Sequence, residues 1–210
     1  MKNFFNNIRT PENNYRFKRK VINTSIIFLL GIILGFLSKW LDSRYFNNSF
    51  LDYLDLGNFF SNMAIWLFCA LAISVYSKSP IRASINVLLF FIGMTISYHL
   101  YTVIFNGFNP KNYMMIWYGF TIISPLLAYI SWYSKSNSKY SIIINSLIIF
   151  VMLASCFNIG MFYFDIKGIL YTITFIGSLC IIYKNIKIIS ISFIIGLILS
   201  FIIRIPFISG

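Results

Sequence analysis

The sequence predicts an all-α transmembrane bundle of seven helices, and three observations lead to this fold class. Hydrophobic residues make up 59% of the 210 residues and charged residues only 10%, which is too apolar for a soluble domain of this size. The apolar residues gather in seven segments with short connections. The alternating pattern of a membrane β-barrel is missing, so each segment is expected to satisfy its backbone hydrogen bonds as a helix.

The seven predicted spans approach the roughly 20 residues that a helix needs to cross the hydrocarbon layer. They are Val21–Lys39, Asn58–Tyr76, Ser84–Phe105, Met115–Tyr133, Ile142–Phe164, Ile169–Tyr183 and Ile188–Ile203. The last two are short, but a re-entrant hairpin would bury Lys184, Asn185 and Lys187 at mid-membrane, where charges are costly. Two complete crossings are therefore favoured, and a bundle of six spans is the alternative.

The basic residues predict the orientation because they fall in alternate connections. With the N-terminus in the cytoplasm, twelve of the 17 Lys and Arg lie inside and four of the five acidic residues lie outside. Every loop then obeys the positive-inside rule, which predicts a multi-pass protein of the cytoplasmic (plasma) membrane. The net charge of +12 is thereby explained as a topology signal, so the lipid bilayer is the expected partner and nucleic acid is not.

The chain is predicted to consist of two parts. A basic cytoplasmic segment covers residues 1–20, and a single transmembrane helical domain covers residues 21–210. Residues 10–12 read Thr-Pro-Glu, the order of an N-cap, an N1 proline and an acidic first turn, which predicts a short helix along the inner membrane surface. The apolar run after Val21 is too long for a signal-peptide core and lacks a small-residue cleavage site. The first span is therefore expected to be retained.

Two sequence features bear on helix packing. In span one, Gly31 and Gly35 form a small-xxx-small face that allows close approach of another helix, either within the bundle or in a partner protein. In span four, Pro125 lacks an amide hydrogen and is expected to kink the helix, freeing a carbonyl near Thr121. Such breaks occur beside cavities and also as plain packing kinks, so both interpretations stay open.

An internal repeat links the inner ends of spans two and four. Residues 73–79 and 130–136 both follow the pattern Ile-Ser-x-Tyr-Ser-Lys-Ser and differ at one position. The following spans each carry Ile-Gly-Met, at residues 92–94 and 159–161. A hairpin of two helices duplicated in parallel orientation would give rise to both matches, although their offsets are 57 and 67 residues. The alternative is convergence, since an aromatic residue followed by Lys is favoured at any inner membrane boundary.

Two short elements are predicted on the outer side, and three cysteines lie within the predicted spans. Residues 49–56 have the spacing of a short helix on the outer surface, and residues 106–110 that of a tight turn. Cys69, Cys156 and Cys180 fall within spans at no metal-ligand spacing, so we expect small buried side chains without disulfides. No metal, cofactor or catalytic motif is present in the sequence.

Most polar residues within the predicted spans fall in the outer half of the membrane. We expect them to line an outward-open pocket, because ionisable groups at membrane depth are costly and often functional. The candidate ligand-binding residues are Lys39, Asp42, Asn62, Tyr98, His99, Tyr101, Trp117 and Asn158. Lys39 and Asp42 are three residues apart and can pair. Simpler roles stay open: snorkelling for this pair, an interhelical hydrogen bond for His99 and an aromatic belt for the Tyr and Trp residues.

Three short motifs resemble a known family. Residues 39–42 (Lys-Trp-Leu-Asp), 77–80 (Ser-Lys-Ser-Pro) and 107–110 (Gly-Phe-Asn-Pro) occur in the order and spacing of a family of small multipass membrane proteins of Gram-positive bacteria. The resemblance covers residues 28–135 and implies a multipass membrane protein without an established activity. Size and hydropathy also resemble the substrate-binding membrane subunits of energy-coupling vitamin importers, although Gly31 and Gly35 replace the paired alanines expected there.

Three functions are consistent with this sequence. The first is transport or small-molecule binding in the outer pocket; because no phosphate-binding loop is present, active uptake would need a gradient or a separate ATPase. The second is an accessory, immunity or assembly protein that binds another membrane protein. The third is a membrane enzyme on a lipid-like substrate, with His99 as base; the lack of a Ser elbow, His pair or paired glutamates argues against it. The oligomeric state is not predicted.

Overall fold

The structure is a computed structural model that describes residues 9–12, 16–43, 53–136, 138–160 and 163–203. These residues form eight α-helices, one short 3-10 helix (η1) and a two-stranded sheet, so the all-α prediction is confirmed except for one small hairpin. The elements are α2 (Phe17–Asp42), α4 (Leu56–Ser61), α5 (Met63–Tyr76), α6 (Pro80–Phe105), α7 (Lys111–Ser131), η1 (Trp132–Lys135), α8 (Tyr140–Cys156), β1 (Phe157–Ile159), β2 (Phe164–Ile166), α9 (Ile169–Ile182) and α10 (Ile186–Ile202).

Each of the seven predicted spans corresponds to a helix. Three helical segments among the described residues are long and apolar enough to cross a membrane: α2, α6 and the stretch Lys111–Lys135 that α7 and η1 form together. The other four, α5, α8, α9 and α10, are apolar helices of 14 to 17 residues. At a rise of about 1.5 Å per residue these are shorter than the roughly 30 Å hydrocarbon layer, so crossing by all seven stays a prediction.

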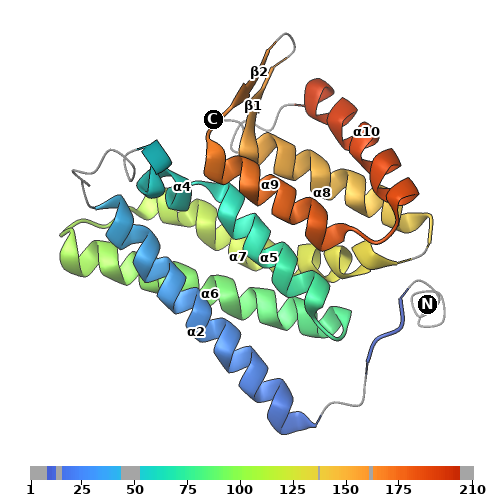
Figure 1. Ribbon diagram of the computed structural model, residues 1–210. Helices are drawn as coiled ribbons and strands as arrows, with labels where there is room; N and C mark the ends of the chain where they lie inside the picture. Colours follow the sequence, from blue (N-terminus) through green and yellow to red (C-terminus); the bar gives the residue numbers. More distant parts are fainter. Residues whose placement is uncertain (1–8, 13–15, 44–52, 137, 161–162, 204–210) are drawn as a thin grey trace.

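The bundle is arranged around α5. Figure 1 shows α2 crossing α6 on one side of the molecule and α10 lying along α8 on the other. One hydrophobic core joins α5, α6 and α7 through Trp66, Phe90 and Trp117, and a second joins α5 to α8 and α9 through Val75 and Ile149. Because α5 contributes to both cores, it holds the two halves of the bundle together.

The two glycines of α2 lie at its contact with α6. A Cβ atom on Gly31 would meet the backbone carbonyl of Phe90, and one on Gly35 would meet that of Met94. Only a residue without a side chain permits this approach. The small-residue face is therefore used inside the chain and is not left open for a partner.

Span two begins later than predicted, because α4 and α5 are separate helices. At Asn62 the backbone is extended, and the Asn62 side chain accepts a hydrogen bond from the amide of Ala64 (3.4 Å). Asn is a favoured N-cap because its side chain satisfies an orphan amide of the first turn. The expected span Asn58–Tyr76 is corrected to the helix Met63–Tyr76.

The predicted end of span five is wrong. Helix α8 ends at Cys156, and β1 then pairs antiparallel with β2, with Phe157 opposite Ile166 and Asn158 opposite Asp165. Each strand has an aromatic, a polar and a β-branched residue in that order, Phe-Asn-Ile in β1 and Phe-Asp-Ile in β2, and Gly160 lies between the strands. This pattern favours a hairpin. Because the residues on both sides of Cys156 are mostly apolar, composition does not reveal where the helical spacing gives way to the alternation of a strand.

The N-terminal helix predicted at residues 10–12 is also wrong. Residues 9–12 are not helical, and α2 begins at Phe17. The Glu12 amide donates to the carbonyl of Lys78 (2.9 Å), and the Glu12 carboxylate accepts from Lys78 Nζ (2.8 Å). This segment therefore bonds to the α5–α6 connection instead of forming a turn of its own.

The remaining local predictions have mixed outcomes. The connection at residues 106–110 is confirmed: Gly107 has φ +71° and the Lys111 amide donates to the Asn109 carbonyl (2.9 Å). Of the predicted outer helix, residues 49–52 lie outside the described residues, Tyr53 and Leu54 are helical, and α4 begins at Leu56 after a turn at Asp55. Cys156 is buried as expected, whereas Cys180 is exposed on α9.

The two copies of the repeated sequence make similar contacts. In the first, the side-chain amide of Asn86 donates to the hydroxyl of Ser77 (3.2 Å). In the second, the side-chain amide of Asn145 donates to the carbonyl of Ser134 (3.3 Å). Each Asn lies on the helix that follows its repeat. The duplication itself stays a prediction.

Candidate functional site

Part of the predicted outer cluster comes together at the end of α2. Lys39 Nζ lies 2.5 Å from a carboxylate oxygen of Asp42, so the expected pairing is present. The same ammonium group lies 5.4 Å from the ring centroid of Tyr98, a distance that allows a cation–π contact. Tyr98 in turn lies beside Tyr113, with ring centroids 6.0 Å apart. The charge of Lys39 is thus balanced within the protein.

His99 has partners at both ring nitrogens. Nδ1 contacts the hydroxyl of Tyr118, and Nε2 lies 3.1 Å from the side-chain oxygen of Asn109. Asn109 lies in the connection that follows α6, and Tyr118 lies in α7, so the imidazole links α6 to both. This arrangement matches the simpler role considered for His99, an interhelical hydrogen-bonding residue.

The other candidates lie in separate places. Asn62 caps α5, Tyr101 packs edge-on against Phe36 (ring centroids 4.9 Å apart), and Asn158 lies in the β1–β2 hairpin. Tyr98 and Trp117 border a cavity of about 10 Å³ at the end of the bundle where α2 finishes beside α4. That volume holds about one water molecule. Of the eight candidates, this cavity brings together Tyr98 and Trp117.

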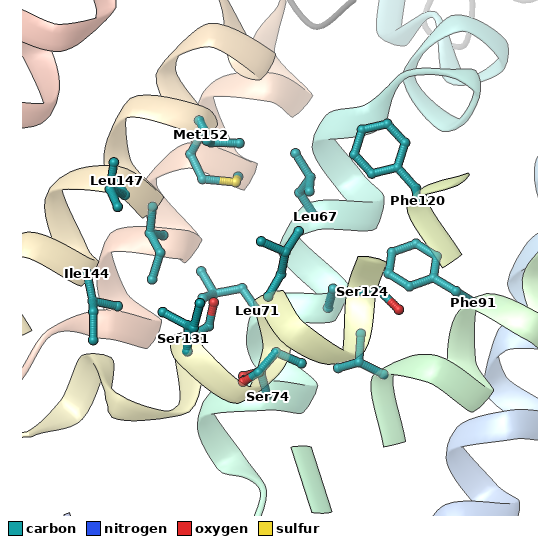
Figure 2. Close-up of a pocket in the computed structure, with 17 residues that line it drawn as sticks. Leu67, Leu71, Ser74, Phe91, Phe120, Ser124, Ser131, Ile144, Leu147 and Met152 are labelled. Atoms are coloured by element: carbon teal, nitrogen blue, oxygen red, sulfur yellow. The ribbon is translucent and has the colours of Figure 1, made fainter. Parts of the chain in front are cut away.

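A much larger cavity lies between the helices nearer the predicted inner end. It has a volume of about 220 Å³ and is bounded by α5, α6, α7 and α8; we call it the lateral cavity (Figure 2). Its lining consists of Leu67, Ala70, Leu71, Ser74, Val87, Phe91, Phe120, Ser124, Leu127, Ala128, Ile130, Ser131, Ile144, Leu147, Ile148, Val151 and Met152. In Figure 2, Leu147 and Met152 of α8 face Leu67 and Leu71 of α5 across the space. Leu127 and Leu147 are 46% and 50% exposed, so the cavity opens on the side of the bundle.

Small residues on facing helices leave this space. Ala70 and Ser74 are four residues apart on α5, and Ser124 and Ala128 are four apart on α7, so each pair lies on one helix face. The Ser74 hydroxyl donates to the carbonyl of Ala128 (2.7 Å), which fixes α5 against α7. Larger side chains at these positions would fill the gap toward α8.

Pro125 shapes the α7 wall of the cavity. Because proline has no amide hydrogen, the carbonyl of Thr121 loses its helical partner, and the hydroxyl of Ser124 donates to it instead (2.9 Å). The carbonyl of Pro125 accepts a second bond from the Ser84 hydroxyl of α6 (2.8 Å). The freed carbonyl that the sequence predicted near Thr121 is therefore satisfied within the protein.

The lateral cavity offers hydrocarbon contacts and little else. The hydroxyls of two of its three serines, Ser74 and Ser124, are already donated to backbone carbonyls. The third, Ser131, is the last residue of α7. No charged residue lines the space, and no group of His, Cys, Asp or Glu that could hold a metal is present among the described residues. Such a lining suits an alkyl chain.

Sequence reasoning missed this site because apolar lining residues look like any other membrane-span residues. The signals that were present are the two small-residue pairs, Ala70 with Ser74 and Ser124 with Ala128, next to Pro125. Only the arrangement of four helices shows that these pairs face one space.

Comparison of the chain with known protein families, curated proteins and solved structures finds no match. The resemblance to small multipass membrane proteins of Gram-positive bacteria therefore stays a prediction.

Proposed function

We propose that this chain is a protein of the cytoplasmic membrane, with seven crossings and its N-terminus inside, that binds a molecule with a hydrocarbon chain in the lateral cavity. The observation that carries this proposal is a space of about 220 Å³ with an apolar lining that opens on the side of the bundle. A side opening faces lipid once the helices cross the membrane. A ligand would therefore enter from the bilayer and not from water.

The volume favours part of a chain over a whole solute. Typical small-molecule pockets measure about 300–1,000 Å³ and place several polar groups around the ligand. The lateral cavity is smaller, and the hydroxyls of Ser74 and Ser124 are engaged. Since the surrounding lipid is equally apolar, the hydrophobic effect gives no preference for the cavity. Shape must select the ligand, so a chain that fits the walls would be held more tightly than bulk lipid.

Photo-crosslinking tests this proposal. The full chain is reconstituted with a trace of phospholipid that carries a diazirine in its acyl chain, irradiated and digested. We expect saturable labelling of peptides from α7 and α8, and competition by the same lipid without the diazirine. Labelling that stays proportional to probe concentration and spreads over all apolar helices would contradict a specific site.

A matched pair of variants makes the test specific. Leu147→Trp places a large ring at the cavity mouth, whereas Ile143→Trp changes an exposed residue one turn earlier on α8 that does not line the cavity. We expect Leu147→Trp to remove the saturable labelling and Ile143→Trp to leave it. Equal labelling in the two variants would exclude the lateral cavity as the binding site.

A further inference from the structure

A second cavity lies at the inner ends of α2, α5 and α6 and shares no lining residue with the lateral cavity. Its volume is about 320 Å³, and we call it the inner cavity. The residues around it are Glu12, Lys20, Asn23, Ile26, Ile27, Ile73, Tyr76, Ser77, Lys78, Ser79, Arg82 and Asn86. It combines three cations and one acid with an apolar wall from α2 and α5.

Arg82 is held in a fixed position within this cavity. Its guanidinium donates to the backbone carbonyl of Lys20 (2.7 Å), to the hydroxyl of Thr24 and to the side-chain oxygen of Asn86 (3.4 Å). Thr24 and Asn86 are buried and also bond to each other (2.8 Å). All of these acceptors are neutral. The positive charge of Arg82 is therefore oriented by the protein but not neutralised by a carboxylate in these contacts.

Glu12 contributes the acidic group of the cavity. Its carboxylate pairs with Lys78 at 2.8 Å, and both side chains are substantially exposed, at 64% and 44%. An exposed pair of this kind contributes little to stability, because water screens both charges. An incoming anion can therefore replace the carboxylate at Lys78 at small cost.

We propose that the inner cavity binds the phosphate group of an anionic phospholipid, with Lys20, Lys78 and Arg82 around the phosphate and an acyl chain along Ile26 and Ile27. Guanidinium and ammonium groups form strong charge-assisted hydrogen bonds with phosphate. Basic pockets between helices at the cytoplasmic boundary are suited to anionic headgroups. The inference rests on the proposed membrane orientation and is independent of the lateral cavity.

Native mass spectrometry of the full chain with phosphatidylglycerol and with phosphatidylcholine tests the site. The double variant Lys20→Gln/Lys78→Gln is compared with Lys18→Gln/Lys139→Gln, which removes two exposed cations of the same predicted side outside the cavity. We expect the first variant to lose about tenfold or more in phosphatidylglycerol affinity and the second to lose much less. Equal losses of phosphatidylglycerol affinity in the two variants would mean that general surface charge attracts the lipid, and would overturn the proposal.

Glu12→Gln gives a test that damage to the fold cannot imitate. Glu12→Gln removes the carboxylate that competes with the phosphate for Lys78, so phosphatidylglycerol should bind more tightly than to the wild type. Unchanged or weaker binding would overturn the assignment. So would equal retention of phosphatidylcholine, and full displacement of the lipid by millimolar inorganic phosphate would identify a site for the free ion instead.

Discussion

Arg9 lies over the indole ring of Trp132, with its guanidinium carbon 4.1 Å from the ring centroid. The same group donates to the carbonyl of Trp132 and to the carbonyl of Val75 (3.1 Å). These carbonyls belong to the C-terminal ends of the α7–η1 segment and of α5, where helices leave acceptors without partners and the helix dipole favours a cation. Burial lowers the pKa of Arg9, and the charge of Glu12 opposes that shift.

Arg9→Gln should destabilise the end of the bundle where α5 and the α7–η1 segment finish. It removes a cation–π contact and leaves the carbonyls of Trp132 and Val75 without their charged donor, at a cost of about 1–3 kcal/mol. Arg9→Lys should lose part of the stabilisation that Arg9 provides, since a single ammonium group cannot reproduce the forked donors of the guanidinium. Thermal unfolding in detergent measures the effect. The exposed Arg19→Gln is the control, and an equal loss of stability there would mean that only net charge matters.

Alanine at two helical glycines should change stability in opposite directions. In an open helical position, Gly→Ala is worth about 1 kcal/mol of helix stability. Gly119 of α7 has open space around its Cβ position, so Gly119→Ala should raise the unfolding temperature. At Gly31 the new Cβ would meet the carbonyl of Phe90 and force α2 away from α6. A stabilised Gly31→Ala would contradict the close contact between α2 and α6.

The outcomes that depend on neighbours along one helix could be predicted from the sequence. Lys39 and Asp42 pair because residues three apart share a helix face, and Thr121 loses an amide partner because Pro125 follows four residues later. Apolar composition likewise located the seven longer helices among the eight that the structure describes. Composition alone did not separate strand from helix after Cys156, where Asn158 lies in a hairpin.

The sites that join distant parts of the chain could not be predicted in the same way. Arg9 and Trp132 are 123 residues apart, and nothing local to either predicts their contact. The lateral cavity needs four helices to be placed before Ala70 and Ala128 are known to face it. The predicted outer cluster shows the converse. A similar predicted membrane depth does not place Asn62, which caps α5, and Asn158, which lies in the hairpin, in one site with Tyr98, because depth does not determine which helix faces meet.

The hydroxyl of Ser124 should matter only while proline occupies the next position. Ser124→Ala leaves the Thr121 carbonyl unpaired in an apolar setting, which should cost about 1–3 kcal/mol. In a Pro125→Ala background the restored amide at position 125 can bond to that carbonyl, so the same serine change should cost much less. A double-mutant cycle on unfolding temperature measures this coupling. Additive effects would show that Ser124 does not compensate for Pro125.

The last two helices should both cross the membrane, which places Lys184 on the cytoplasmic side. Lys184 Nζ donates to the carbonyl of Lys135 (2.9 Å), so the α9–α10 turn lies beside η1 at the predicted inner boundary. Helices α9 and α10 are short, and a re-entrant hairpin would instead hold Lys184 within the bilayer.

Cysteine accessibility separates these two arrangements. In a chain whose three native cysteines are replaced by serine, Lys111→Cys should react with a membrane-impermeant maleimide in intact cells. Lys135→Cys and Lys184→Cys should react only in inverted vesicles. If Lys184→Cys reacts from neither side while Lys135→Cys behaves as expected, the hairpin is re-entrant and the bundle has fewer crossings. Labelling of Lys135→Cys in intact cells would reverse the proposed orientation, and with it the inner position of the cavity around Arg82.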